Sequence, residues 1–490
     1  MSQNPRPSDW APKAQQQHLD VRLFVLASLA AGLGYVLLPV DPQFSAAIPT
    51  MTMFRGLVAG CVAGLLVVSP NPRWTAPAAT TLGIAIGTIF VAIAAPGGLS
   101  AVPLLAGLAL GIGAALLLSW LVSSNMTVVA ETLAVLSVLV VLLWCAGWLP
   151  GAMRDGADFR HRQAELSVAP QPGTYSFDGY AFLRTYYLMK AGEGYYAAFL
   201  RGLSDDLLYR HAARPLVLRS PFNYREPFVF YLWRVLPGDS GAALFGWFVV
   251  YAALVLVCSY VLASTLVARG IALLAPLALV AWFFYFFWAP PRFALTEVWA
   301  AGFGVAAVMC LVRKWRVPSL VLVTAAVAAR EFMVLLIPAW LLLWWFSGNR
   351  KANRWFAAAA VLGPALALAA HFLSVPATSG DTGSVTRWFH GGLYRLLDAL
   401  RYGFDFMPAG SWLALVIAAA AIAGAILARP RWRMSALLVA TVLPTLFLLT
   451  FGLGVWSYYW GAFYVPLAVS IAPGVLGRLL PAEAAGVRVR

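Results

Sequence analysis

Three carboxylates of this 490-residue chain could carry acid–base chemistry: Asp178, Glu297 and Glu331. Asp178 precedes a segment rich in Tyr and Phe, whereas Glu297 and Glu331 interrupt long apolar runs. A charged group within such a run is costly unless it is paired or functional. Because a positioned carboxylate can take a proton from a hydroxyl group, all three are candidate catalytic residues.

Each of these residues also has a purely structural interpretation. Asp178 stands before Gly-Tyr-Ala, where it could cap the N-terminus of a helix. Glu297 could pair with Arg292, five residues earlier, and Glu331 could pair with its neighbour Arg330. The residue types alone leave both interpretations open.

Arginine supplies most of the basic charge, and its planar guanidinium binds phosphate oxygens in a bidentate manner. Ordinary contacts to lipid headgroups are the competing explanation for such residues. The candidate phosphate-binding side chains are Arg184, Arg201, Arg219, Arg225 and Arg330. Carboxylate oxygens would also suit Mg²⁺ or Mn²⁺, but the sequence has no fixed ligand spacing, so the metal requirement stays unknown.

The composition determines where these groups must act. The chain is 62% hydrophobic and only 11% charged, whereas a soluble domain carries about 25% charged residues. Its four cysteines lie in apolar runs and suggest neither a disulfide framework nor a zinc site. We therefore expect an all-α polytopic membrane protein in contact with the lipid bilayer, and no nucleic-acid partner.

Apolar runs long enough for helices recur along nearly the whole chain. The first twenty residues are polar and lack the apolar core of a cleaved signal, so residue 21 is expected to open a retained crossing. The predicted runs are about 21–40, 54–69, 78–95, 102–122, 127–149, 241–268, 271–289, 296–312, 317–346, 356–375, 411–428, 434–452 and 461–477.

Residues 317–346 form an apolar run with basic clusters on both sides, Arg313-Lys314-Trp315-Arg316 before it and Arg350, Lys351 and Arg354 after it. Because basic loops stay in the cytoplasm, the chain must enter and return within this run. The sequence predicts two half-helices with a turn at Arg330-Glu331. Counting both gives about 14 transmembrane or half-membrane helices, with cytoplasmic termini.

Residues 150–240 form a large external loop in this topology. Tyr, Phe, Arg and Lys alternate at helical spacing over residues 179–203, which predicts an amphipathic helix lying along the membrane surface. A second interfacial helix is expected in the loop 376–410, around Leu393, Leu396, Leu397 and Leu400. Asp178, Glu297 and Glu331 all fall on the outer side.

Six short motifs follow one another along the chain: Asp178-Gly179-Tyr180 with Arg184, Gly192-Glu193-Gly194-Tyr195, Arg225-Glu226-Pro227, Leu295-Thr296-Glu297, Ala329-Arg330-Glu331, and the aromatic stretch 456–464 ahead of Pro466. Their order resembles the GT-C class of polytopic glycosyltransferases, which use polyprenyl-phosphate sugars. The resemblance covers residues 127–480, roughly. Unlike the family, the chain has four further crossings before its acidic loop.

The resemblance implies transfer of a sugar from a polyprenyl-phosphate donor to a glycan, lipid or protein acceptor at the outer face of a bacterial inner membrane. It implies that Asp178 is the base, that Glu297 and Glu331 assist, and that the five arginines bind the donor phosphate. The expected organisation is a polar tail 1–20, a four-helix module 21–126, a catalytic core 127–480 and a second tail 481–490.

Two other functions are compatible with the same residues. A transporter or flippase of lipid-linked sugars would also use charged residues in broken helices. A polymerase or ligase of lipid-linked polysaccharide would use a diphosphate donor and external Arg and His. A transporter needs access to both sides of the membrane, whereas an enzyme gathers its polar groups on one side.

Overall fold

The computed structural model describes residues 164–174, 178–206, 224–267, 272, 274–288, 291–346, 350–351, 353–376, 391–404, 410–452 and 454–476. The predicted module 21–126, the crossing 127–149 and both tails lie outside these residues. Within the described residues every element is a helix, which confirms the all-α fold class there.

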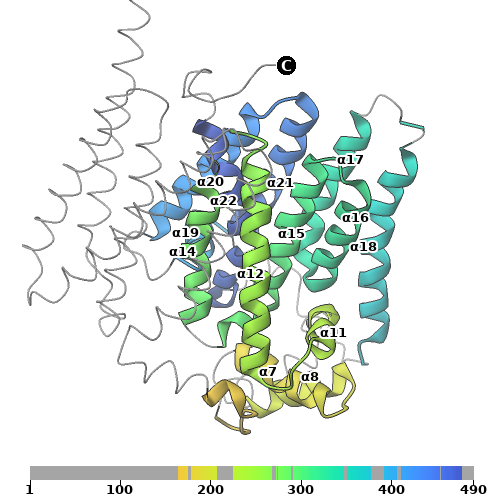
Figure 1. The fold of residues 1–490 in the computed structure, drawn as a ribbon, viewed down its shortest axis with the longest axis vertical. Helices are drawn as coiled ribbons and strands as arrows, with labels where there is room; N and C mark the ends of the chain where they lie inside the picture. The colour runs from red at the N-terminus through yellow and green to blue at the C-terminus, as the bar shows by residue number, and fades with distance from the viewer. Residues whose placement is uncertain are drawn as a thin grey trace, which may run out of the picture.

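Upright helices form a bundle, and short helices lie across one of its ends (Figure 1). The upright helices are α12 (Gly241–Ala263), α14 (Leu274–Trp288), α15 (Thr296–Val312), α16 (Arg316–Ala329), α17 (Ile337–Trp345), α18 (Arg354–Ser374), α20 (Gly410–Leu427) and α21 (Arg431–Thr450). Each apolar run predicted after residue 240 is thus helical over most of its described residues, with a break at Arg330 in the run 317–346. Among these helices α12, α18 and α21 are long and apolar enough to cross a membrane. The total of about 14 crossings stays a prediction.

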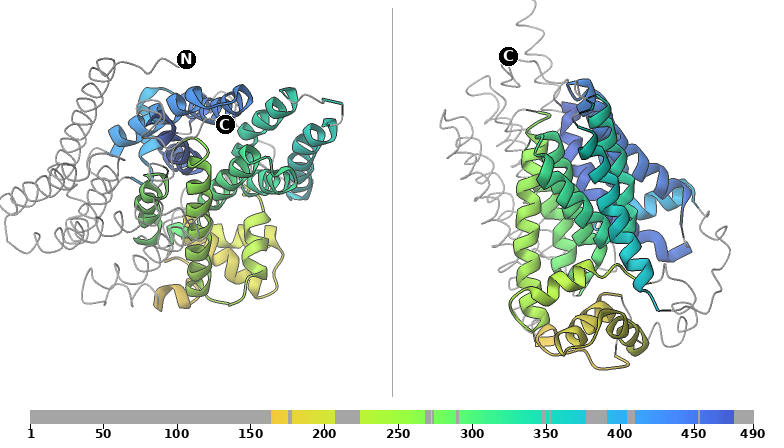
Figure 2. Two further views of the ribbon diagram at one scale, coloured as in Figure 1. Left: turned by 45° about the horizontal axis from the view of Figure 1, so that its top comes forward. Right: turned by 90° about the vertical axis from the view of Figure 1, so that its right-hand side faces the viewer.

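Helices α7 (Asp178–Lys190) and α8 (Tyr195–Asp205) lie crosswise beneath the bundle (Figure 2), together with α11 (Phe228–Val235). The single amphipathic helix predicted over residues 179–203 is therefore wrong. Gly192 has a φ of 103°, and the N–H groups of Gly192 and Glu193 donate to the carbonyls of Met189 and Leu188. This glycine-dependent motif ends α7 and lets α8 turn back.

The two helices and the turn at Arg330-Glu331 that were predicted for residues 317–346 are present, whereas their depth in a membrane stays a prediction. Helix α16 ends at Arg330, whose backbone is extended, and the chain returns through the 3-10 helix η5 (Glu331–Leu336) into α17. Trp340 of α17 donates its indole N–H to the hydroxyl of Ser319 on α16, at 3.2 Å. The two arms therefore run in opposite directions, and helix α18 packs against both of them.

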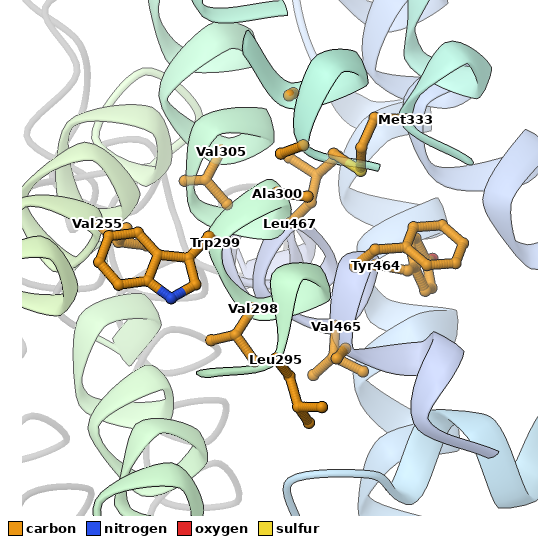
Figure 3. Packing of buried hydrophobic residues seen from close by; sticks show 14 of the residues in the cluster. Val255, Leu295, Val298, Trp299, Ala300, Val305, Met333, Tyr464, Val465 and Leu467 are labelled. Carbon is orange, nitrogen blue, oxygen red and sulfur yellow. The ribbon is translucent and has the colours of Figure 1, made fainter. Parts of the chain in front are cut away.

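Helix α15 is the centre of the bundle, with all but two of its 17 residues buried. A helix that is apolar on every side must be covered on every side. Figure 3 shows Trp299 pointing toward Val255 of α12, whereas Tyr464 and Val465 cover the opposite side. Glu297 lies in the first turn of this enclosed helix.

The last segments close the bundle. The 3-10 helix η7 (Gly454–Phe463) leads into α22 (Val465–Ile471) and η8 (Ala472–Val475), and α19 (Leu393–Arg401) packs against η7 and α20. Leu396 and Leu400 of α19 are buried, whereas Leu393 and Tyr394 are exposed. The predicted second amphipathic helix is thus present within the loop 376–410.

Close packing between η7 and α19 requires glycine at position 461. A Cβ at this position would overlap the carbonyl oxygen of Ala399, which is backbone and cannot rotate away. We expect Gly461→Ala to destabilise the protein by about 1–3 kcal/mol, the usual cost of overpacking. Gly246→Ala is the matched control, because a Cβ there meets no atom within 4 Å. Thermal unfolding of the purified protein should show a lowered Tm only for Gly461→Ala; equal effects would contradict the packing argument.

Candidate functional site

Three carboxylates surround the guanidinium of Arg330. Arg330 Nε lies 2.9 Å from Glu297 Oε1, and Nη1 lies 3.0 Å from Glu331 Oε2 and 3.7 Å from Glu226 Oε2. The three acids come from α15, from the start of η5 and from the segment before α11. We call Glu226, Glu297, Arg330 and Glu331 the Arg330 cluster.

The break between α16 and η5 is what brings these groups together. Because Arg330 leaves the helical conformation, the N–H of Glu331 has no acceptor from the preceding turn. Glu226 Oε1 accepts this hydrogen bond at 3.1 Å. The Glu226 carboxylate therefore accepts the hydrogen bond of the first N–H of η5 and also faces the Arg330 side chain.

A second cation adjoins the Arg330 cluster. Arg225 Nη2 lies 4.0 Å from Asp178 Oδ2 and donates a hydrogen bond of 2.8 Å to the hydroxyl of Tyr459. Tyr459 lies within the electrostatic range of Asp178, Arg225, Glu297 and Arg330, so both groups of charges belong to one site. Asp178, Arg225 and the Arg330 cluster together hold four carboxylates and two guanidinium groups.

Helix α8 is connected to this site through two consecutive tyrosines. Tyr195 donates its hydroxyl to the backbone carbonyl of Arg225, and Tyr196 donates to the carbonyl of His371 on α18, at 3.0 Å. Burial raises the pKa of Tyr195 well above its ordinary value, so its hydroxyl stays protonated and available as a donor. The position of Arg225 is thus coupled to that of α8.

Aromatic rings lie beside the guanidinium of Arg330. The guanidinium carbon of Arg330 lies 4.8 Å from the ring centre of Phe332, whose ring is 4.7 Å from Trp460 and 5.0 Å from Phe447. Such surroundings exclude water and strengthen electrostatic interactions relative to bulk solvent. They also make an unpaired charge more costly.

Exposure differs among the charged side chains. The side chains of Glu297, Arg330 and Glu226 are 0, 1 and 3% exposed, whereas that of Glu331 is 20% exposed. Asp178 and Arg225 are 13 and 14% exposed. Asp178, Arg225 and Glu331 are therefore the members that a bound molecule could touch, while Glu297 and Arg330 lie behind them.

Five of the eight site residues predicted from the sequence meet here: Asp178, Arg225, Glu297, Arg330 and Glu331. Asp178 lies in the first turn of α7, close to the capping position considered for it, and its carboxylate faces Arg225. Of the two pairing partners considered for Glu297 and Glu331, Arg330 contacts both. Arg292 instead lies over the ring of Tyr285, at 4.0 Å.

The other predicted phosphate-binding residues lie elsewhere. Arg184 Nε is 3.3 Å from Asp205 Oδ2, and Arg201 pairs with Glu193 at the exposed edge of α8. Both cations thus have carboxylate partners within the α7–α8 pair. Arg219 lies outside the described residues.

Two residues of the site were absent from the candidates derived from the sequence. Glu226 follows Arg225 in the motif Arg225-Glu226-Pro227. An acidic residue between an arginine and a proline in an aromatic segment could have marked it as a site residue. Tyr459 lies in the aromatic stretch 456–464. Nothing in the spacing of that stretch distinguishes it from its neighbours.

The carboxylates of the site do not form a metal centre. Among the residues that the structure describes, no three His, Cys, Asp or Glu side chains are grouped to hold a metal ion. The Arg330 guanidinium occupies the position between Glu226, Glu297 and Glu331 that a cation would take. We therefore derive no step that requires Mg²⁺ or Mn²⁺.

Comparisons of this chain with protein-family models, with curated proteins and with solved structures find no match.

Removal of Arg330 should leave the buried carboxylates of Glu226 and Glu297, and the partly exposed carboxylate of Glu331, without their shared cation. We expect Arg330→Gln to cost about 3–5 kcal/mol of stability, the usual cost of breaking a buried ion pair. In the double variant Arg330→Gln with Glu297→Gln, one of the unpaired charges is gone, so some of the stability should return. Thermal unfolding of the wild type, of Arg330→Gln, of Glu297→Gln and of the double variant tests this coupling. A double variant as unstable as the sum of its single changes would contradict it.

The charge of Glu226 should make stability depend on pH. Burial, and then the charge of Glu331, raise the pKa of Glu226 well above its ordinary value of 4.5. A raised pKa means that the folded state binds the proton more tightly, so this contribution is complete below the ordinary pKa and is lost as pH rises through the folded-state pKa. Glu226→Gln should therefore reduce the loss of stability at rising pH.

The measurement is the Tm of the wild type and Glu226→Gln across about pH 5 to 9, the range in which a raised carboxyl pKa would act. Glu193→Gln removes a carboxylate that pairs with the exposed Arg201, outside the Arg330 cluster, and serves as the control. It should follow the wild-type profile. Parallel curves for the wild type and Glu226→Gln would show that Glu226 does not titrate in this range.

Proposed function

We propose that this chain is a membrane glycosyltransferase, similar to the GT-C class, that transfers a sugar from a polyprenyl-phosphate donor to an acceptor hydroxyl. The observation that carries the proposal is the convergence of Asp178, Arg225, Arg330 and Glu331 at one end of the bundle, against α7 and α8. The first loop, the 225–227 motif and the half-helix turn, which are distant in sequence, thereby contribute to one site.

Asp178 is the proposed general base. Its side chain is 13% exposed, it lies in the first turn of α7, and its carboxylate faces Arg225 at 4.0 Å. An ionised carboxylate can accept several hydrogen bonds, so it can take one from an acceptor hydroxyl beside those of its existing partners. Glu331, the most exposed carboxylate around Arg330, is proposed to position the acceptor by accepting hydrogen bonds from the hydroxyl groups of that molecule.

Arg225 is the proposed contact to the donor phosphate, because it is the partly exposed cation of the site. Arg330 is enclosed, so it would act on the phosphate through its electrostatic field and through the position of Glu331. Glu297 would hold Arg330 in place and would not contact the substrate. Arg184 and Arg201 have no substrate contact in this proposal, because they pair with Asp205 and Glu193.

The proposed reaction is a single displacement. The acceptor oxygen forms a bond to the anomeric carbon, and the bond between that carbon and the phosphate oxygen breaks. The hydroxyl proton passes to Asp178, and the electron pair of the broken bond leaves with polyprenyl phosphate. A guanidinium beside the leaving phosphate stabilises its growing negative charge.

The orientation follows from the charge distribution. The turns between α15 and α16 and between α17 and α18 carry Arg313, Lys314, Arg316, Arg350 and Lys351, and basic loops remain cytoplasmic. The acidic site is at the other end of these helices, so it would open to the outside. The resemblance to the GT-C class adds a bacterial inner membrane to the proposal, and the proposed donor is lipid-linked because the outer compartment normally supplies no nucleotide sugar.

An activity assay tests the proposal directly. Purified chain in detergent would receive radiolabelled polyprenyl-phosphate hexoses and pentoses with a lysate-derived glycolipid fraction as acceptor. Asp178→Asn should lower release of polyprenyl phosphate by about 10²–10⁴-fold, the usual contribution of a general base. Asp239→Asn is the control, because Asp239 is 88% exposed and lies outside the site. Full activity of Asp178→Asn would remove the assignment of the base.

The helix break at Arg330 is also a feature of transporters, so proteoliposomes separate the two functions. A transporter would move labelled polyprenyl-phosphate sugar between leaflets without breaking the phosphate–sugar bond. An enzyme would release the lipid phosphate and require an acceptor. Leaflet exchange with an intact donor would overturn the proposed reaction.

A further inference from the structure

A cavity of about 270 Å³ lies at the end of the bundle opposite the carboxylates. Lys314 and Arg316 line it together with Trp344, Asn353, Phe356 and Trp432. These residues come from the turn between α15 and α16, the end of α17, the start of α18 and the start of α21. The cavity is smaller than the about 300–1,000 Å³ of sites for drug-sized ligands, so a compact group fits it best.

The charge at this end has no acidic counterpart in the segments that form it. Segments 298–330, 332–376 and 410–476 contain no Asp or Glu. The described basic residues at this end are Arg313, Lys314, Arg316, Arg350, Lys351, Arg354, Arg429, Arg431 and Arg433. Lys314 and Arg316 therefore direct positive charge into the cavity, which favours an anion.

Both cations are held in position by neighbours that do not neutralise them. Arg316 Nη1 donates to Asn353 Oδ1 at 2.6 Å, and its guanidinium carbon is 6.0 Å from the ring centre of Phe356. Lys314 Nζ lies 5.6 Å from the ring centre of Trp432. Contacts with aromatic faces orient a cation while leaving its charge available.

Lys314 also occupies a backbone position where glycine is preferred. Its φ is 61°, and the N–H groups of Lys314 and Trp315 donate to the carbonyls of Leu311 and Cys310. This is the left-handed position that closes a helix, where a residue with a Cβ is strained. Strained backbone positions cluster at functional sites, which agrees with a binding role for this lysine.

Exposed tryptophans identify the level of the cavity relative to a membrane. Trp315, Trp345 and Trp355 are 53, 52 and 47% exposed and flank the same turns. Exposed Trp at one level of a helix bundle is typical of the membrane–water interface, where its amphipathic ring lies among the headgroups. An anion that reaches this cavity from the membrane is therefore a lipid phosphate.

We propose that this cavity binds the phosphate headgroup of an anionic phospholipid from the leaflet opposite the carboxylate site, with Lys314 and Arg316 as its cations. The proposal is independent of the proposed enzymatic activity. Each cation near a charged membrane surface contributes about 1 kcal/mol, which corresponds to about a fivefold change in affinity.

Binding to the full-length protein in detergent tests the site. The ligands are short-chain phosphatidylglycerol, short-chain phosphatidylcholine and inorganic phosphate, with the shift in Tm and the Kd as readouts. We expect stabilisation by phosphatidylglycerol and little effect of the other two. Equal stabilisation by inorganic phosphate would assign the cavity to a free anion, and equal stabilisation by phosphatidylcholine would remove the role of charge; either result overturns the proposal.

Two substitutions distinguish a binding role from a structural one. Lys314→Gly relieves the backbone strain, so it should keep or raise the Tm without ligand while it weakens phosphatidylglycerol binding about fivefold. Arg316→Gln should weaken binding by a similar factor. Arg234→Gln, at an exposed arginine of α11, is the control and should bind as the wild type does. Unchanged affinity of Lys314→Gly would overturn the site.

Discussion

The rest of the site depends on the ion pairs between the buried guanidinium of Arg330 and its three carboxylate partners. Three carboxylates from separate segments can share a low-dielectric space only because this cation lies between them. The extended backbone at Arg330 belongs to the same arrangement, since it frees the N–H that Glu226 accepts. The half-helix turn, the central helix α15 and the segment before α11 are therefore held together by one side chain. A substitution that moves one of these segments should therefore move the others.

Charge is distributed unequally between the two ends of the bundle. Four carboxylates gather with two guanidinium groups at the α7–α8 end, whereas the opposite turns carry only basic side chains in their described segments. The apolar middle of the bundle separates the two ends by about 25 Å, the length of the 17-residue α15 at 1.5 Å per residue. In the proposed topology this polarity orients the molecule in the membrane. It also separates the proposed catalytic site from the proposed lipid site.

The sequence predicted features that depend on local pattern and did not predict those that depend on distant contacts. Apolar runs and flanking basic clusters indicated the helices after residue 240 and the reversal at Arg330. The break at Gly192 was visible as a pair of glycines, but the periodicity of the surrounding aromatic residues favoured one continuous helix. The partners of Arg184 and Glu297 are 21 and 33 residues away, and Tyr459 meets Arg225 across 234 residues. No spacing rule relates such positions. The motif around Glu226 was a local signal that did not indicate its partners, and Tyr459 became recognisable only in three dimensions.

The half-helix turn has a further consequence for passage through the molecule. Helices α16 and α17 both extend from the basic end, and the turn between them carries Arg330 and Glu331 of the acidic site. A polar solute moving along this line from the acidic site toward the basic turns would have to pull Arg330 away from its carboxylates. Because a buried charge is costly to leave unpaired, these ion pairs form an energetic barrier between the two ends of the bundle.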